Sequence, residues 1–262
     1  MKPAEVSEFG SVPELSFTNN GALPVLLVDG EELIGAKQNR ILNLTVLAPA
    51  HRKLSIPVSC VEQGRWSYRS AAFASAPRAQ FAASRANKVA SVSSSLRDRG
   101  RADSDQNEVW EDIDRMAANL RVASPTSAMS DLYESYSADL DECVQELSPV
   151  KAQVGAAFAI SGEIVGFDLF DRASTLRKLL PKLVSSYAIQ GLSRRTEKGV
   201  EAPNEEAVRE LLDAVSNSQG RSFTATGEGE DVRIEEAGLS AAALLAKARL
   251  IHLCGFRVKA SR

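Results

Sequence analysis

Two short polar stretches in the first quarter of the chain carry the side-chain types that binding and catalytic sites use. They are Gly35–Arg40 and Cys60–Trp66. The candidate site residues in them are Lys37, Gln38, Asn39 and Arg40, and Cys60, Glu62, Gln63, Arg65 and Trp66. Amides donate and accept hydrogen bonds, an ionised carboxylate only accepts, and lysine and arginine only donate. If the two stretches meet, they can surround a polar ligand such as a sugar, a base edge or a phosphate.

The segments between the two stretches predict that they do meet. Residues 40–47 and 54–60 both alternate apolar and polar side chains, which is typical of β-strands with one buried face. A turn-like break at Ala48–Lys53 separates them. Antiparallel pairing must set apolar against apolar side chains, because a one-residue slip would turn the core face outward. The register that does so pairs Val46 with Leu54, Leu44 with Ile56, Leu42 with Val58, Arg40 with Cys60, Gln38 with Glu62, and Lys37 with Gln63.

Two interpretations of this polar cluster remain open. It is either a ligand or catalytic site, or a buried hydrogen-bond network that fixes the strand ends and satisfies itself. Cys60 carries the same ambiguity. Arg40 across the strands could lower the pKa of a nucleophilic thiol, but Cys60 shares the apolar face of Ile56 and Val58, which favours a small core residue.

A resemblance rests on the same segments. Val28–Asn43 (VDGEELIGAKQNRILN) and Ile56–Trp66 (IPVSCVEQGRW) resemble a bacterial family of unknown function. That family is named for association with ADP-ribosylglycohydrolase and rhodanese/phosphatase-superfamily proteins (ARG and rhodanese-phosphatase-associated protein domain). The similarity covers nearly the whole chain, and its specific motifs lie between Asp29 and Trp66. It implies a setting in NAD and ADP-ribose metabolism, and it brings no catalytic assignment.

An ADP-ribose- or NAD-related ligand gives each candidate residue a role. Glu62 would be the general acid or base, with Glu32 second and Cys60 a competing nucleophile. Lys37 and Arg65 would hold phosphate, and Trp66 would stack on a base or ribose. The side chains expected to orient the sugar or amide are Gln38, Asn39, Asn43 and Gln63. Arg40 and Arg85 complete the expected ligand-binding residues.

Composition indicates an ordinary globular protein. The chain has 262 residues, is 44% hydrophobic and 25% charged, and has a net charge of −3. This charge balance does not favour a nucleic-acid-coating role, and no apolar run is long enough to suggest a membrane span. Three widely spaced cysteines and no apolar leader favour a reducing cytoplasm. Two histidines and no Cys-x-x-Cys motif predict no standard zinc site.

The order of elements predicts an α+β fold. We expect antiparallel strands first, a central helical segment, and then mixed strands and helices, in a single domain over 1–262 with 77–148 as a helical insertion. The expected hairpins are 12–18 with 22–28, 154–160 with 163–170, and 221–226 with 231–235. The expected helices are 79–99, one opening at 104–106, one carrying Leu132–Leu147, 174–190, one opening at Asn204, and an Ala- and Leu-rich stretch before a last strand at 250–254.

Two charged features of these elements have competing interpretations. The charges of Arg78, Arg85 and Lys88 are typical of a solvated helix face, although Arg85 sits in the apolar stripe and could reach the polar cluster. Asp168 and Asp171 either face a ligand or cap the next helix, and capping is the favoured interpretation.

Three functional hypotheses follow from the sequence. The chain is a ligand-binding protein or enzyme acting on an ADP-ribose- or NAD-related molecule, a non-catalytic module partnering ADP-ribose-processing enzymes, or a self-associating protein. The sequence identifies no cofactor, substrate or oligomeric state.

Overall fold

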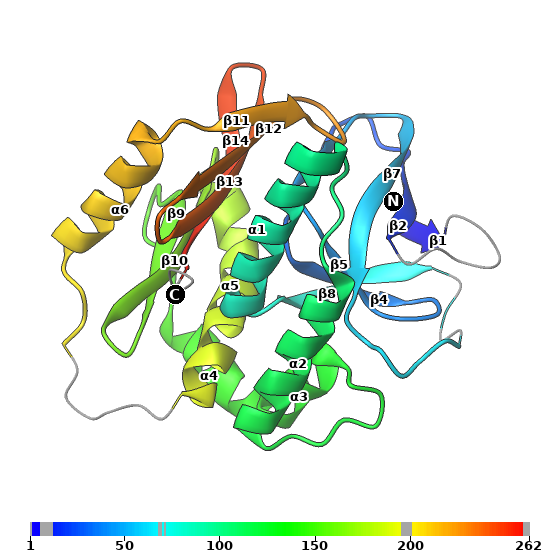
Figure 1. The fold of residues 1–262 in the computed structure, drawn as a ribbon, viewed down its shortest axis with the longest axis horizontal. Helices are drawn as coiled ribbons and strands as arrows, with labels where there is room; N and C mark the ends of the chain where they lie inside the picture. Colours follow the sequence, from blue (N-terminus) through cyan, green and yellow to red (C-terminus); the bar gives the residue numbers. More distant parts are fainter. Residues whose placement is uncertain (1, 6–12, 68–69, 71, 195–200, 259–262) are drawn as a thin grey trace.

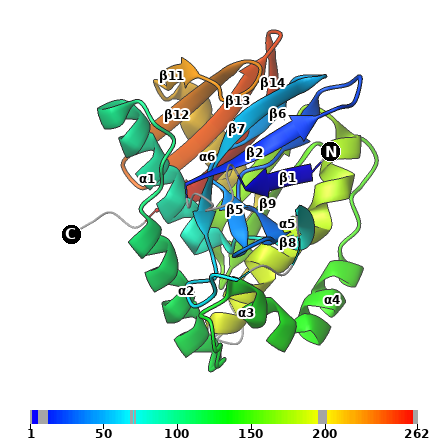
Figure 2. The same ribbon diagram turned by 90° about the vertical axis from the view of Figure 1, so that its right-hand side faces the viewer.

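The computed structural model describes residues 2–5, 13–67, 70, 72–194 and 201–258. These residues form two six-stranded antiparallel sheets, one two-stranded sheet and six helices, which confirms the α+β class. In Figure 1 the N-terminal sheet lies on the right and the C-terminal sheet on the left, with α1 (Ala82–Arg99) running between them. Figure 2 shows the strands of both sheets in the upper part of the molecule, with α2 (Gln106–Leu120), α3 (Met129–Ser135) and α4 (Ser137–Glu146) below them.

The N-terminal sheet has the strand order β1-β2-β7-β5-β4-β8. Its strands are β1 (Lys2–Glu5), β2 (Glu14–Asn19), β7 (Arg52–Cys60), β5 (Arg40–Leu42), β4 (Glu31–Gly35) and β8 (Phe73–Ala79). A separate pair is formed by β3 (Val25–Leu27) and β6 (Val46–Ala48). The predicted hairpin of 12–18 with 22–28 is therefore wrong. Asn19 is buried, and its amide donates to the carbonyls of Leu23 and Pro49, both at 2.9 Å, which turns the chain out of the sheet.

The predicted register of β5 with β7 is confirmed where it matters for the site. Arg40 pairs with Cys60, and Leu42 pairs with Val58. The pairings of Leu44 with Ile56 and of Val46 with Leu54 are wrong, because β5 ends at Leu42 and β6 joins β3 instead. The partners of Ile56 and Leu54 are Leu15 and Phe17 of β2.

β5 ends just before Asn43, a buried residue that contacts two other segments of the chain. Its buried side chain accepts a hydrogen bond from Ser59 Oγ at 2.6 Å and donates to the carbonyl of Ala102 at 3.1 Å. Leu44 and Val46 still enter the same hydrophobic core as Leu42. Alternation therefore predicted which side chains are buried, but not which strand they meet.

The C-terminal sheet has the order β11-β12-β13-β14-β10-β9. Its strands are β11 (Arg221–Thr224), β12 (Glu230–Glu236), β13 (Leu239–Ala246), β14 (Arg249–Arg257), β10 (Glu163–Phe170) and β9 (Gly155–Ile160). Both hairpins predicted here are confirmed. The helix predicted from the Ala- and Leu-rich stretch is wrong, because β13 pairs along its length with β12 and β14. Tertiary pairing on both sides outweighs the helix propensity of alanine and leucine.

Helices cover both faces of this sheet. On one face, α6 (Glu205–Asn217) buries Leu211 and Val215 against strand residues such as Phe167. On the other face, α1 and α5 (Ala173–Ser193) pack against β14 through a core that includes Val89, Tyr187 and Phe256.

The other predicted helices are confirmed, with one correction. Asp105 caps α2 and Asn204 caps α6 through their side chains, and Gly100 ends α1 in the left-handed conformation (φ 66°). The helix expected over Leu132–Leu147 is divided at Tyr136 into α3 and α4. None of the helices in the described part of the chain has the length and apolarity that a membrane-spanning helix needs.

The loop between β11 and β12 joins the C-terminal sheet to β6 of the two-stranded sheet. The amide of Glu228 donates to the carbonyl of Leu47 at 2.9 Å. A Cβ atom at Gly227 would lie 2.2 Å from the same carbonyl oxygen, which is closer than any side chain tolerates. Glycine at this position therefore allows the loop to contact the backbone of β6.

Candidate functional site

The two polar stretches meet at the end of the β5–β7 pair. The side-chain amide of Gln38 donates to the carbonyl of Glu62 at 2.9 Å, and the amide of Val61 donates to the carbonyl of Asn39 at 3.1 Å. We call this region the hairpin site. It is defined by Glu32, Lys37, Gln38, Asn39, Arg40, Cys60, Glu62, Gln63, Arg65 and Trp66. The predicted proximity of Gln38 and Glu62 is confirmed.

Asn39 links two buried carboxylates. Its backbone amide donates to Glu62 Oε2 at 3.2 Å, and its side-chain amide donates to Glu32 Oε1 at 3.3 Å. Each carboxylate also has an arginine partner: Arg65 Nη2 lies 2.6 Å from Glu62 Oε2, and Arg78 forms an ion pair with Glu32. The site therefore contains a pair of acids joined by one amide residue and flanked by two cations.

The carboxylate of Glu32 is shifted toward its neutral form. Burial raises the pKa of Glu32 above its usual value, and the nearby negative charge of Glu62 adds to this rise. Arg78 and Asn39 oppose the rise without cancelling it. A raised pKa in one of two adjacent carboxyl groups is a feature of acid–base pairs.

Arg40 is fully buried and only partly paired. Its Nη1 donates to Gln38 Oε1 at 2.9 Å, whereas Nε and Nη2 have no hydrogen-bond partner among the described residues. The two carboxylate oxygens of Glu5 are also buried without such a partner. Burial lowers the pKa of Arg40, against opposing contributions from Cys60 and Glu5. Arg40 therefore keeps donors available inside the site.

Trp66 forms the exposed edge of the hairpin site. Its side chain is 52% exposed. Lys37 Nζ lies 5.2 Å from the centre of the Trp66 ring, and Arg40 Cζ lies 5.9 Å from it. An exposed aromatic ring with two cations beside it is suited to a planar, negatively charged ligand.

Arg65 is occupied by internal contacts. Its Nη1 donates to the carbonyls of Ala36 at 2.9 Å and Ser67 at 2.7 Å, and Nη2 contacts Asn39 Oδ1 at 3.2 Å as well as Glu62. This part of the cluster fits the interpretation as a self-satisfied network. Arg65 orders the loop rather than presenting its charge outward.

The environment of Cys60 favours a core residue over a nucleophile. Its side chain is fully buried, and burial raises the pKa of the thiol even though Arg40 lies nearby. Gln106 at the start of α2 holds the backbone on both sides, accepting from the Cys60 amide at 2.8 Å and donating to its carbonyl at 2.9 Å.

Two of the expected ligand residues lie apart from the carboxylate pair. Asn43 contacts Ser59 and Ala102, as described above. Arg85 is fully buried in a second group of charges, where Nη2 lies 2.8 Å from Asp168 Oδ1 and Nε lies 3.3 Å from Asp29 Oδ2. This buried charge cluster consists of Asp29, Arg85, Lys88, Asp168 and His252.

The predicted solvated face of α1 and the predicted helix cap are both wrong. Arg85 and Lys88 are almost completely buried, and Arg78 pairs with Glu32 from β8. Asp168 caps no helix; it contacts Arg85, and His252 Nε2 lies 3.2 Å from its Oδ1. The position of Arg85 within an apolar stripe was the sequence signal for this burial.

Three residues outside the hairpin site act on its side chains, and none of them was predicted to do so. Arg78 pairs with Glu32, Thr126 Oγ1 donates to Glu62 Oε1 at 3.4 Å, and Glu5 influences Arg40. All three lie outside the two polar stretches, and no periodicity or motif in the sequence points to their role. Within the described ranges, no group of three or more His, Cys, Asp or Glu side chains is arranged to hold a metal ion.

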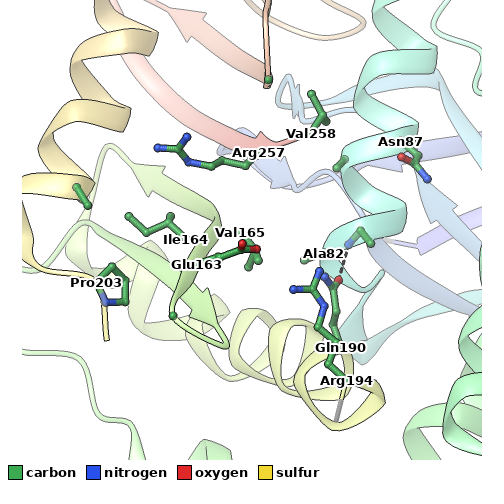
Figure 3. Close-up of a pocket in the computed structure, with 15 residues that line it drawn as sticks. Ala82, Asn87, Glu163, Ile164, Val165, Gln190, Arg194, Pro203, Arg257 and Val258 are labelled. Carbon is green, nitrogen blue, oxygen red and sulfur yellow. Dashed lines mark hydrogen bonds between the residues drawn. The ribbon is translucent and has the colours of Figure 1, made fainter. Parts of the chain in front are cut away.

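A large cavity lies in another part of the molecule. It has a volume of about 760 Å³ and is bounded by the start of α1, the end of α5, α6, the start of β10 and the end of β14 (Figure 3). None of the predicted site residues lines it.

Comparison with known proteins yields one match. No curated protein and no solved structure matches the chain. A family model, described as the ARG and Rhodanese-Phosphatase-superfamily-associated Protein domain, matches residues 2–256. The match spans both sheets and all six helices of the described structure, together with the whole hairpin site. The chain therefore belongs to the ARG and Rhodanese-Phosphatase-superfamily-associated Protein domain family.

Proposed function

We propose that the chain binds an ADP-ribose- or NAD-related ligand at the hairpin site, in the cytoplasm. The family description supports the ligand class, since it refers to association with ARG, the ADP-ribosylglycohydrolase. The geometry supports the location, because amide, acidic and cationic side chains from two distant segments converge beside an exposed aromatic ring.

The observation that carries this proposal is the incomplete pairing of Arg40. A guanidinium group that is fully buried with two unpaired nitrogens is costly, and a phosphate or carboxylate supplies the acceptors it lacks. Arg40 Cζ also lies 5.9 Å from the centre of the Trp66 ring. A ligand stacked on Trp66 would bring its phosphates toward Arg40 and Lys37.

Thermal shift measurements test this proposal. ADP-ribose should raise the melting temperature of the wild type, because a ligand at 100 times its Kd stabilises the native state by about 2.7 kcal/mol. Lys37→Ala and Trp66→Ala should each reduce the shift. Lys53→Ala, which removes an exposed lysine of β7 in the same sheet, should leave it unchanged.

Two outcomes of the thermal shift measurements would contradict ligand binding at the hairpin site. If ADP-ribose, NAD and nicotinamide all leave the melting temperature of the wild type unchanged, the hairpin site is a structural network. Equal shifts in Lys37→Ala, Trp66→Ala and Lys53→Ala would place the ligand elsewhere.

A second candidate function is acid–base catalysis on the same ligand. It is favoured by the Glu32–Glu62 pair, in which burial raises the pKa of one carboxyl group while Arg65 pairs with the other. In this scheme Glu62 abstracts or donates the proton, Glu32 assists, and Gln38 and Asn39 hold the reacting group in place.

Glu62→Gln separates catalysis from binding. General acid–base catalysis contributes about 10²–10⁴-fold in rate, so turnover of ADP-ribose or NAD followed by chromatography should fall by that factor while the thermal shift persists. Glu14→Gln, which changes an exposed acid of β2, should keep full turnover. Binding by the wild type without any turnover would support the alternative of a non-catalytic binding module.

A further inference from the structure

The cavity of about 760 Å³ has the size of a small-molecule site. Its walls come from elements far apart in sequence, including Ala82 and Ala83 of α1, Ile164 of β10, and Arg257 of β14. Figure 3 shows Arg194 and Gln190 beside the Ala82 end of α1, and Arg257 on the opposite side of the cavity near Ile164. None of the residues that line this cavity belongs to the hairpin site.

The lining of this cavity carries more positive than negative charge. Arg194, which is half-buried, and Arg257, which is exposed, line it, and neither side chain forms a hydrogen bond or ion pair with another described residue. Glu163 is the only acidic side chain among the lining residues of the described structure. Two arginines without partners facing one cavity favour an anionic occupant.

The start of α1 adds to the positive potential. This helix has 18 residues, no acidic residue in its first turn and no side-chain cap at Phe81. Gln190 Oε1 accepts from the amide of Ala83 at 2.6 Å, which is the hydrogen bond drawn in Figure 3. This bond engages the Ala83 amide, so the helix start adds the positive end of its dipole to the cavity, and the Ala83 amide is not a free donor there.

The remaining walls are apolar. They are formed mainly by Ala86, Ile164, Val165, Pro203 and Val258. An inorganic ion would leave this surface uncovered, whereas a larger ligand would bury it and gain about 25 cal/mol for each Å² removed from water.

We propose that this cavity binds a small molecule that has a phosphate or carboxylate group attached to an apolar body. Arg194 and the start of α1 hold the anionic group, Arg257 contributes from the other side, and Ile164, Val165 and Val258 cover the apolar body. This inference is independent of ligand binding at the hairpin site.

Fluorescence titration with 8-anilinonaphthalene-1-sulfonate, an anionic aromatic probe, tests the proposal on the whole chain. We expect saturable binding of one probe per chain. Arg194→Gln and Arg257→Gln should each weaken it about tenfold, the loss expected for one charge-assisted hydrogen bond. The matched control is Arg177→Gln, which changes an exposed arginine of α5 outside the cavity and should bind as the wild type does.

A second variant tests shape rather than charge. Ala83 lines the cavity and is exposed, so Ala83→Trp should fold normally and block the probe while both arginines remain. Circular dichroism and thermal melting of each variant show that the fold is kept. Binding that is unsaturable, or equal in the wild type, Arg194→Gln and Ala83→Trp, would overturn the proposal.

Two competitors with the same ring identify the anionic group. Phenyl phosphate and benzoate differ only in that group, and displacement of the probe by one or both supports the site and names its chemistry. Failure of both to displace the probe at millimolar concentration would overturn the proposed ligand class.

Discussion

Arg40 and Arg85 are both buried arginines, yet their partners give them different meanings. Arg85 forms ion pairs with Asp29 and Asp168, and these charges raise its pKa even though burial alone would lower it. Arg40 keeps two nitrogens without a hydrogen-bond partner among the described residues, and burial lowers its pKa. The first is a structural ion pair, and the second is a candidate ligand contact. Burial alone does not distinguish the two; the pairing of each nitrogen does.

Thiol labelling tests the assignment of Cys60 to the core. Cys60 and Cys254 are buried, and burial raises the pKa of both thiols, that of Cys254 to about 12, whereas Cys143 is partly exposed. At pH 8 we therefore expect the native protein to react rapidly with Ellman's reagent at one thiol, identified by mass spectrometry as Cys143. Denaturant should release the other two. Rapid reaction of native Cys60 would restore it as a candidate nucleophile.

At the scale of elements, local patterns predicted most strands and helices but not their partners. The alternation in 40–47 and 54–60 correctly predicted that Arg40 pairs with Cys60, because β5 and β7 are hydrogen-bonded neighbours at that end. The alternation could not show that β6 pairs with β3, since Val46 would be buried in the core whether its strand paired with β3 or with β7. The prediction of a helix at β13 failed for a related reason. Alanine and leucine carry no strand signal, and only the pairing with β12 and β14 makes this segment a strand.

For the candidate site as well, contacts set by local strand pairing were predictable and contacts between distant segments were not. The proximity of Gln38 and Glu62 followed from strand register, which is a local property. The contribution of Arg78, and the placement of Arg85 with Asp168, depend on packing between segments more than 40 residues apart. No periodicity in one sequence encodes such contacts.

The buried charge cluster makes α1 a connector between the two sheets. Lys88 Nζ lies 2.5 Å from Asp29 Oδ1 and donates to the carbonyl of Leu42 at 2.6 Å, and Arg85 reaches Asp168 of β10. Burial would raise the pKa of Asp168, but Arg85 and His252 outweigh this effect and hold it well below its usual value. A carboxylate with a depressed pKa stabilises the folded state wherever the unfolded chain would already be ionised.

Asp168→Asn should therefore lower the free energy of unfolding by about 3–5 kcal/mol at pH 7, because it leaves Arg85 with an unmatched charge. The difference from the wild type should shrink as the pH falls below about 4, where Asp168 in the unfolded chain becomes protonated. Urea denaturation at several pH values measures this. Glu235→Gln, which removes an exposed partner of Arg97, should change stability by less than about 1 kcal/mol. A constant Asp168→Asn difference down to pH 3 would contradict the role of this ion pair.

At the scale of the whole molecule, the contacts between the sheets favour a single folding unit. Thr45 Oγ1 lies 2.7 Å from His252 Nδ1, which links the segment after β5 to β14. Helices from the 77–148 segment also contribute to shared cores, as Val109 and Met129 do with Ile41 and Ile189. The proposal of one domain over 1–262, with 77–148 as a helical insertion, is consistent with these contacts.

Calorimetry tests this proposal directly. Because the buried charge cluster needs Asp29 from the turn before β4 and Asp168 from β10, loss of one half should expose unpaired charges in the other. We expect one unfolding transition in which the calorimetric and van't Hoff enthalpies agree. Two resolved transitions would divide the chain into separate domains.

The contact between Gly227 and Leu47 has a practical consequence for anyone who modifies this protein. The segment Gly227-Glu228-Gly229-Glu230 has the glycine and glutamate content of an exposed loop, which is the usual choice for inserting an epitope tag or a fluorescent reporter. In the folded chain it is held against the backbone of β6. A tag placed there would push the C-terminal sheet away from β6, whereas the turn at Lys247-Ala248, between β13 and β14, offers a safer position.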